Sequence, residues 1–253
     1  MKIVLKFGGT SVGNGKKIIN VCEIVQKVKK NNQVIVISSA LQSTTDELLE
    51  LSEDAKKGQV NKKIIDDIVQ RHQDTIKDII QDKKIQDEVF EKISSLIKDL
   101  EKTVEGVIIV KELSDKTRDK IISFGERLAV PIISAKLRDM GIKAESFTGG
   151  EVGIMTDENF GNASPLMKVT QHNVKNNLSN LLEETVPVIT GFIGVTQQGD
   201  ISTIGRGGSD FSASLIGMCL SVDEIWFMTD VDGLLTANPN IYPNAKTIPQ
   251  LSY

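Results

Sequence analysis

The chain has 253 residues, of which 40% are hydrophobic and 25% are charged, and these proportions are ordinary for a globular protein. Its net charge of −4 and its aromatic content of only 4% argue against non-specific binding to nucleic acid. No apolar run approaches the roughly 20 residues that span a bilayer, and the N-terminal apolar stretch is too short for a signal peptide. We therefore expect a cytoplasmic protein with no nucleic-acid or membrane partner, in which Cys22 and Cys219 are buried thiols.

The first quarter of the chain alternates predicted strands and helices. A short apolar run over 3–5 ends in glycine, as a buried strand does, and apolar residues then recur at helical spacing over 18–28. A second strand is predicted over 34–37 and a second helix over 46–57. The first strand–helix–strand unit predicts a right-handed parallel crossover.

The middle of the chain is rich in charge and has a helical pattern. Apolar stripes over 61–105 predict a pair of helices inserted into the α/β domain, with the insertion at about 55–105. Periodicity leaves residues 107–110 open, as a strand or as the end of the preceding helix. One long helix is predicted over 115–139, with Pro131 as a candidate kink.

The second half returns to alternating strands and helices. Strands are predicted over 142–147, 152–155, 187–190 and 225–228, and helices over 165–182 and 209–220. This order predicts a three-layer α/β/α sandwich with a mostly parallel central sheet and an inserted helical segment, forming a single domain over 1–253.

Two glycine-rich segments carry the strongest chemical signal. Residues 204–208 hold three glycines around Arg206, directly before a predicted helix, and residues 6–13 follow the first strand with Lys6, Gly8 and Gly9. Glycine turns let backbone amides approach an anion, and a helix start adds partial positive charge. Two anion loops, each with a cation, predict that phosphate is handled between two anionic partners.

Other polar residues lie where predicted elements end. Ser39 closes a strand at its carboxyl end, where open α/β sheets bind ligands. Thr45 precedes a predicted helix, and the pattern is equally typical of N-capping and of a substrate contact. Glu126 has two interpretations: a functional carboxylate, or an exposed glutamate paired with Arg127. His72 and His172 show no metal-ligand spacing, and we predict no metal site.

Several motifs, in order along the chain, resemble those of aspartate kinases in the amino-acid kinase superfamily. The resemblance runs from residue 2 to 253, and the combination of its first and fourth motifs is specific. The motifs are Lys6 to Val12, then Ser39-Ala40 with Thr45-Asp46, Phe124 to Leu128, Gly205 to Ala213, and Thr229 to Leu234.

The resemblance implies a role for each candidate residue. Lys6 would be catalytic and neutralise charge on the transferred phosphoryl group, with Asp210 holding Lys6 in place. Arg206, a planar fork, would bind the substrate α-carboxylate with help from Ser209. The amino-acid substrate would also contact Ser39 and Thr45, with Glu126 at its amino group. Nucleotide binding is expected at Lys6, Gly8, Gly9, Thr229, Asp230 and Leu235. The family often has a tyrosine and an arginine where this chain has Leu235 and Asn240, which predicts weaker nucleotide binding.

The resemblance therefore implies ATP-dependent phosphorylation of the side-chain carboxylate of L-aspartate, with Mg²⁺ carried by ATP, in a homodimer. This product, 4-phospho-L-aspartate, would lie on the path to lysine, threonine and methionine. The domain is expected to be truncated at its C-terminal end and to lack C-terminal regulatory domains. Two alternatives stay open: another carboxylate or phosphate kinase of the superfamily, and a non-catalytic amino-acid-binding subunit.

Overall fold

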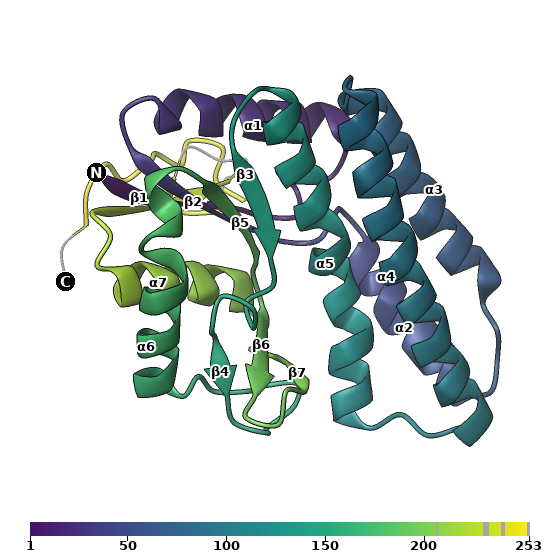
Figure 1. The fold of residues 1–253 in the computed structure, drawn as a ribbon. Coiled ribbons are helices and arrows are strands. Elements are labelled where there is room, and N and C mark those ends of the chain that lie inside the picture. Colours follow the sequence, from purple (N-terminus) through teal and green to yellow (C-terminus); the bar gives the residue numbers. More distant parts are fainter. Residues whose placement is uncertain (206, 230–232, 239–240, 252–253) are drawn as a thin grey trace.

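A five-stranded parallel sheet forms the centre of the molecule in the computed structural model, which describes residues 1–205, 207–229, 233–238 and 241–251. The strand order is β3-β5-β2-β1-β8 (Figure 1), and each neighbouring pair is parallel. Continuous apolar runs build the three inner strands, as expected when both faces of a sheet are covered. The strands are β1 (Lys2–Phe7), β2 (Gln33–Ser38), β3 (Ala144–Phe147), β5 (Val186–Thr190) and β8 (Glu224–Met228).

The alternation of side chains along each strand divides the interior into two cores. Ile3, Leu5 and Phe7 of β1 face one core, whereas Val4 faces the other. Helices α1 (Gly15–Lys29) and α5 (Asp115–Asp139) cover the first face. Helices α6 (Met167–Leu178) and α7 (Gly208–Leu220) cover the second. The predicted three-layer α/β/α arrangement is confirmed.

Three further helices extend the layer that contains α5. They are α2 (Thr44–Lys56), α3 (Lys62–Ile79) and α4 (Lys83–Val110), and with α5 they form the group of long helices on the right of Figure 1. Their apolar faces join the core around α1 and α5. The open question at 107–110 is settled, since these residues are the last turn of α4. Helix α5 runs through Pro131 without interruption.

A second, smaller sheet lies beyond the carboxyl ends of the main strands. It has the order β4-β6-β7, made of β4 (Met155–Thr156), β6 (Ile193–Thr196) and β7 (Ile201–Thr203). The strand expected over 152–155 is wrong for most of its length, because residues 148–153 form turns that hydrogen-bond to one another. The helix expected over 165–182 is shorter at both ends, and a 3₁₀ turn, η1 (Leu181–Glu183), follows it.

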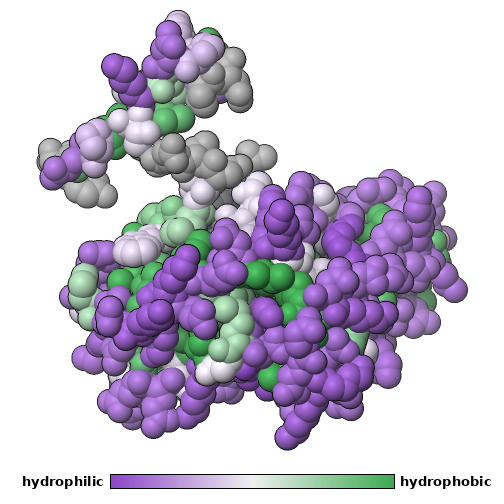
Figure 2. All heavy atoms as spheres, turned by 90° about the horizontal axis from the view of Figure 1, so that it is seen from above, coloured by the Kyte–Doolittle hydropathy of each residue, from purple (hydrophilic) through white to green (hydrophobic). Residues whose placement is uncertain are grey.

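The surface agrees with the charge content of the sequence. Hydrophilic side chains dominate the face seen from above, with apolar patches between them (Figure 2). Within the described residues, no helix combines the length and the apolar character needed to cross a membrane.

Candidate active site

A cavity of about 290 Å³ opens where strands β1 and β2 end and helix α7 begins. Its volume is near the lower end of the roughly 300–1,000 Å³ typical of small-molecule sites. Every residue predicted for catalysis or substrate binding lines it, except Arg206, which lies outside the described residues. The lining consists of Lys6, Ser39, Thr45, Glu126, Phe192, Gly205, Gly207, Gly208, Ser209 and Asp210.

Lys6 and Asp210 form an ion pair at the edge of this cavity. The distance from Lys6 Nζ to Asp210 Oδ1 is 2.6 Å, and the Lys6 side chain is only 14% exposed. Because Lys6 follows the alternation of β1, its side chain lies on the same face as Val4, where α7 packs. The N-cap position of α7 is Gly207, so Asp210, in the first turn of this helix, is not its capping residue.

A close approach of the loop after β2 to the first turn of α7 brings Ser39 and Ser209 together. Ser39 Oγ donates a hydrogen bond to Ser209 Oγ at 3.2 Å. Gly191, which follows β5, makes the approach possible, because a Cβ there would lie 2.6 Å from the Cβ and Oγ of Ser209. Sequence reasoning missed Gly191 as part of the site, although a glycine directly after a buried strand is a signal of such an approach.

Glu126 lies in the floor of the cavity and is 4% exposed. Burial raises the pKa of Glu126 from 4.5 to about 8, and a hydrogen bond from the backbone of Ala40 acts in the opposite direction. Glu126 Oε2 has no hydrogen-bond partner among the described residues. A buried carboxyl group with a free oxygen favours a cationic ligand at this point.

The alternative interpretation of Glu126, an exposed residue paired with Arg127, is wrong. Arg127 points elsewhere: its Nη2 lies 3.6 Å from Asp99 Oδ2, and its guanidinium lies 4.3 Å from the centre of the Phe124 ring. The preceding residue, Gly125, explains how α5 reaches the cavity. A Cβ there would lie 2.8 Å from the Cβ of Ala40, so glycine lets the helix contact the loop that carries Ser39.

Thr45 belongs to the first turn of α2 and is held there by a distant arginine. The N-cap position is Ser43, so Thr45 is not the cap. Arg71 of α3 forms two hydrogen bonds with Glu47, at 2.8 and 2.5 Å, and further bonds with Gln42 O and Thr44 Oγ1. The arginine thereby fixes the segment around Thr45. No local pattern could have identified Arg71, because its partners precede it by 24 residues or more.

Apart from Lys6, which lines the cavity, the described residues predicted for the nucleotide lie next to the cavity or away from it. Gly8 and Thr229 follow β1 and β8, which are neighbours in the sheet, and Ser11 Oγ donates to Met228 O at 3.4 Å between them. Gly9 packs closely on the loop after β2, since a Cβ on it would lie 3.3 Å from Ala40 O.

Of the other two nucleotide candidates, the structure describes Leu235. Leu235 pairs with Thr247 in an isolated bridge, and it does not line the cavity. Asp230 lies outside the described residues. Nucleotide binding by these residues stays a prediction. Across the described ranges, no group of three histidine, cysteine or acidic side chains is placed to hold a metal ion.

Comparisons with known proteins give the context for this geometry. A family model described as "Amino acid kinase family" matches residues 1–253. The chain is 34% identical to aspartokinase 1, chloroplastic, of Arabidopsis thaliana, over 99% of this chain and 44% of that protein. It is 29% identical to the aspartokinase of Geobacillus stearothermophilus, covering 99% of this chain and 48% of that protein.

Solved structures of aspartokinases also resemble this chain. E. coli aspartokinase III, in a crystal structure with aspartate and ADP, superposes with a TM-score of 0.87 at 26% identity, covering 98% of this chain and 53% of that one. The chain thus spans about half the length of the curated relatives it matches. An isopentenyl phosphate kinase, at 16% identity and a TM-score of 0.52, shares the fold. The chain belongs to the amino acid kinase family.

Proposed function

We propose that this chain is the catalytic region of an aspartate kinase, which transfers the γ-phosphoryl group of magnesium-ATP to the side-chain carboxylate of L-aspartate. The observation that carries the proposal is the cavity itself. It combines a lysine–aspartate pair with a buried carboxyl oxygen of Glu126 that has no hydrogen-bond partner among the residues that the structure describes. The similarity of the whole chain to aspartokinases supports the same assignment.

The chemistry needs no general base from the protein. A carboxylate with an ordinary pKa of about 3.9 is already ionised at neutral pH. One of its oxygens attacks the γ-phosphorus, the bond from that phosphorus to the bridging oxygen breaks, and the electron pair leaves with ADP. The barrier is the repulsion between two anions, so positioning and charge neutralisation carry the catalysis.

Each residue predicted for the site has a place in this scheme. Lys6, oriented by Asp210, neutralises charge on the transferred group, and magnesium carried by ATP adds to this effect. Glu126 accepts the ammonium group of aspartate, which gives its unpartnered oxygen a donor. The hydroxyls of Ser39, Thr45 and Ser209 line the remaining wall. The planar guanidinium group of Arg206 binds the α-carboxylate. The nucleotide is bound by Gly8, Gly9, Thr229, Asp230 and Leu235.

The wider setting follows from this activity. The product, 4-phospho-L-aspartate, would open the synthesis of lysine, threonine and methionine in the cytoplasm, and residues 1–253 would form one catalytic domain within a homodimer. The aspartokinases that the chain resembles are about twice as long as the part of them that it matches.

A substrate panel tests the proposal. ADP release is measured with L-aspartate, N-acetyl-L-aspartate, L-glutamate and N-acetyl-L-glutamate under saturating magnesium-ATP. We expect L-aspartate to be the best substrate and N-acetyl-L-aspartate to be rejected, because acetylation removes the ammonium partner of Glu126. A preference for an acetylated substrate would assign the chain to a different kinase of the family.

A further inference from the structure

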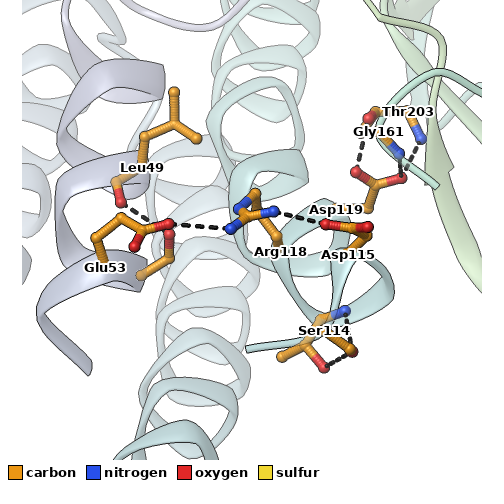
Figure 3. A network of polar contacts seen from close by, with 10 residues as sticks. Leu49, Glu53, Ser114, Asp115, Arg118, Asp119, Gly161 and Thr203 are labelled. Carbon is orange, nitrogen blue, oxygen red and sulfur yellow. Dashed lines mark hydrogen bonds and ion pairs between the residues drawn. The ribbon is translucent and has the colours of Figure 1, made fainter. Parts of the chain in front are cut away.

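Asp119 is a buried carboxylate of α5 that does not line the cavity, yet it has three hydrogen-bond donors. It is 1% exposed, and it accepts bonds from Gly161 N at 2.9 Å, Thr203 N at 2.8 Å and Thr203 Oγ1 at 2.8 Å (Figure 3). A buried carboxylate without partners is costly, so these donors must stay in place for the local structure to persist.

Of the two donor residues, Thr203 leads directly into the glycine loop, of which the structure describes residues 204, 205, 207 and 208, and Gly161 lies in a separate loop that packs on it. Thr203 ends β7, and Gly205, two residues later, lines the cavity. Gly161 lies in the loop before α6, and its neighbour Asn162 packs on Gly205, where a Cβ would lie 2.5 Å from Asn162 Oδ1. These segments are also joined to each other by a bond from Ala163 N to Thr203 O at 2.9 Å. Asp119 therefore fixes the start of the loop, directly at Thr203 and indirectly through the segment of Gly161.

The same helix carries Glu126 into the cavity. Asp119 and Glu126 are seven residues apart, which is two helical turns, so they lie on one face of α5 about 10 Å apart along its axis. Helix α5 is thus a common support for two walls of the cavity, the carboxyl group of Glu126 and the glycine loop.

We propose that Asp119 is a positioning residue, which sets the separation between Glu126 and the glycine loop and thereby the fit of the amino-acid substrate. The inference rests on the proposed function for the identity of that substrate. Asp119 acts through Thr203 and Gly161, because it touches neither the cavity nor the reacting groups. If the loop shifts relative to Glu126, the cavity can no longer bind both ends of the amino-acid substrate at the same time.

The preceding residue offers a matched control. Arg118 points away from the glycine loop: its Nη2 contacts Glu53 Oε1 of α2 at 3.0 Å, and its Nη1 contacts Asp115 Oδ1 at 2.6 Å (Figure 3). The Arg118 side chain is 30% exposed. Removing this ion pair weakens the attachment of α5 to α2 without altering the bonds that hold the glycine loop.

The test compares four variants for kcat, for KM of aspartate, for KM of ATP and for thermal unfolding. Asp119→Asn removes the charged acceptor, and Thr203→Val removes only the hydroxyl donor while keeping shape and N–H. We expect both to raise the KM of aspartate by about tenfold and to change the KM of ATP less than twofold. Thr203→Ser keeps a hydroxyl and should therefore have the wild-type KM of aspartate. Arg118→Gln should lower the melting temperature without changing the KM of aspartate.

Two kinetic outcomes would overturn the inference. One is an unchanged KM of aspartate in Thr203→Val, which also decides the matter if Asp119→Asn does not fold. The other is a rise in the KM of aspartate in Arg118→Gln as large as that in Thr203→Val, which would show that the KM only follows the loss of thermal stability. Hydrogen exchange separates this inference from the proposed function. If the wild-type chain neither binds nor phosphorylates aspartate, the function fails. Faster exchange over 157–165 in Thr203→Val than in Arg118→Gln would still support the positioning role of Asp119, and equal exchange would refute it.

Discussion

Replacing Glu126 by glutamine tests the proposed role of the buried carboxyl group through the pH dependence of binding. The pKa of this group is raised to about 8, so the free protein holds Glu126 mostly protonated at pH 7. An ammonium ligand needs the carboxylate, and binding must therefore release a proton below that pH. We expect the affinity of the wild-type chain for aspartate to rise by up to about tenfold per pH unit between pH 6 and 8.

The same pKa shift sets the stability of the unliganded protein. The native state keeps a proton on Glu126 between its ordinary pKa of 4.5 and about 8, whereas the unfolded chain loses it. The stabilising contribution is present in full below about pH 4.5 and is lost progressively as the pH rises to about 8. At about 1.4 kcal/mol per pKa unit, the loss is ~5 kcal/mol at most. Glutamine has no proton to lose, so in Glu126→Gln residue 126 should make no contribution to a fall in the free energy of unfolding between pH 4.5 and 8.

Calorimetric titration of aspartate in two buffers with different ionisation enthalpies measures the affinity and the number of protons released on binding. The wild-type chain should release nearly one proton per bound aspartate at pH 7 and show the rising affinity. Glu126→Gln should bind more weakly, release no proton and show a flat affinity between pH 6 and 8. Urea unfolding at pH 5 and pH 8 supplies the stability comparison. A wild-type affinity that is flat over this range, or a slope that survives in Glu126→Gln, would refute the reasoning.

Three further predictions follow from the same geometry. Lys6→Ala should lower kcat by roughly 10²–10³-fold with little effect on aspartate binding, and a raised KM at normal kcat would remove Lys6 from catalysis. Gly191→Ala should cost about 1–3 kcal/mol in urea unfolding and weaken aspartate binding, because the new Cβ meets Ser209; unchanged binding and stability would show that the loops relax freely. Both thiols should resist a thiol reagent until the protein is unfolded, because burial raises the pKa of Cys22 to about 12 and also that of Cys219; rapid labelling of the native chain would contradict this.

The sequence predicted the main sheet and its covering helices, because these elements carry strong local patterns. Buried strands such as β1 and β2 are continuous apolar runs that end in small residues, and α5 was predicted with its observed bounds. The short strands β6 and β7 were not predicted. They have four and three residues, which is too little for a period to appear. Residues 152–153 form a turn but were predicted as part of a strand, because Val152, Ile154 and Met155 are apolar.

The composition of the cavity was largely predictable, whereas its supports were not. Lys6 lies near the end of a strand, Ser39 follows one and Ser209 lies in the first turn of a helix, and such positions converge at one edge of a parallel sheet. The burial of Glu126 could not be decided from periodicity, since α5 is buried around most of its circumference. Arg71 and Asp119 depend on contacts with residues distant in sequence, and no local rule reports such contacts.

The most direct test of the central claim is to trap the product with hydroxylamine. The chain is incubated with magnesium-ATP, L-aspartate and hydroxylamine, and the hydroxamate formed from an acyl phosphate is measured. We predict hydroxamate that requires both ATP and L-aspartate, equals the ADP released, and falls at least a hundredfold in Lys6→Ala. ADP release without hydroxamate, or hydroxamate formation that is unaffected in Lys6→Ala, would contradict phosphoryl transfer to the aspartate carboxylate at this site.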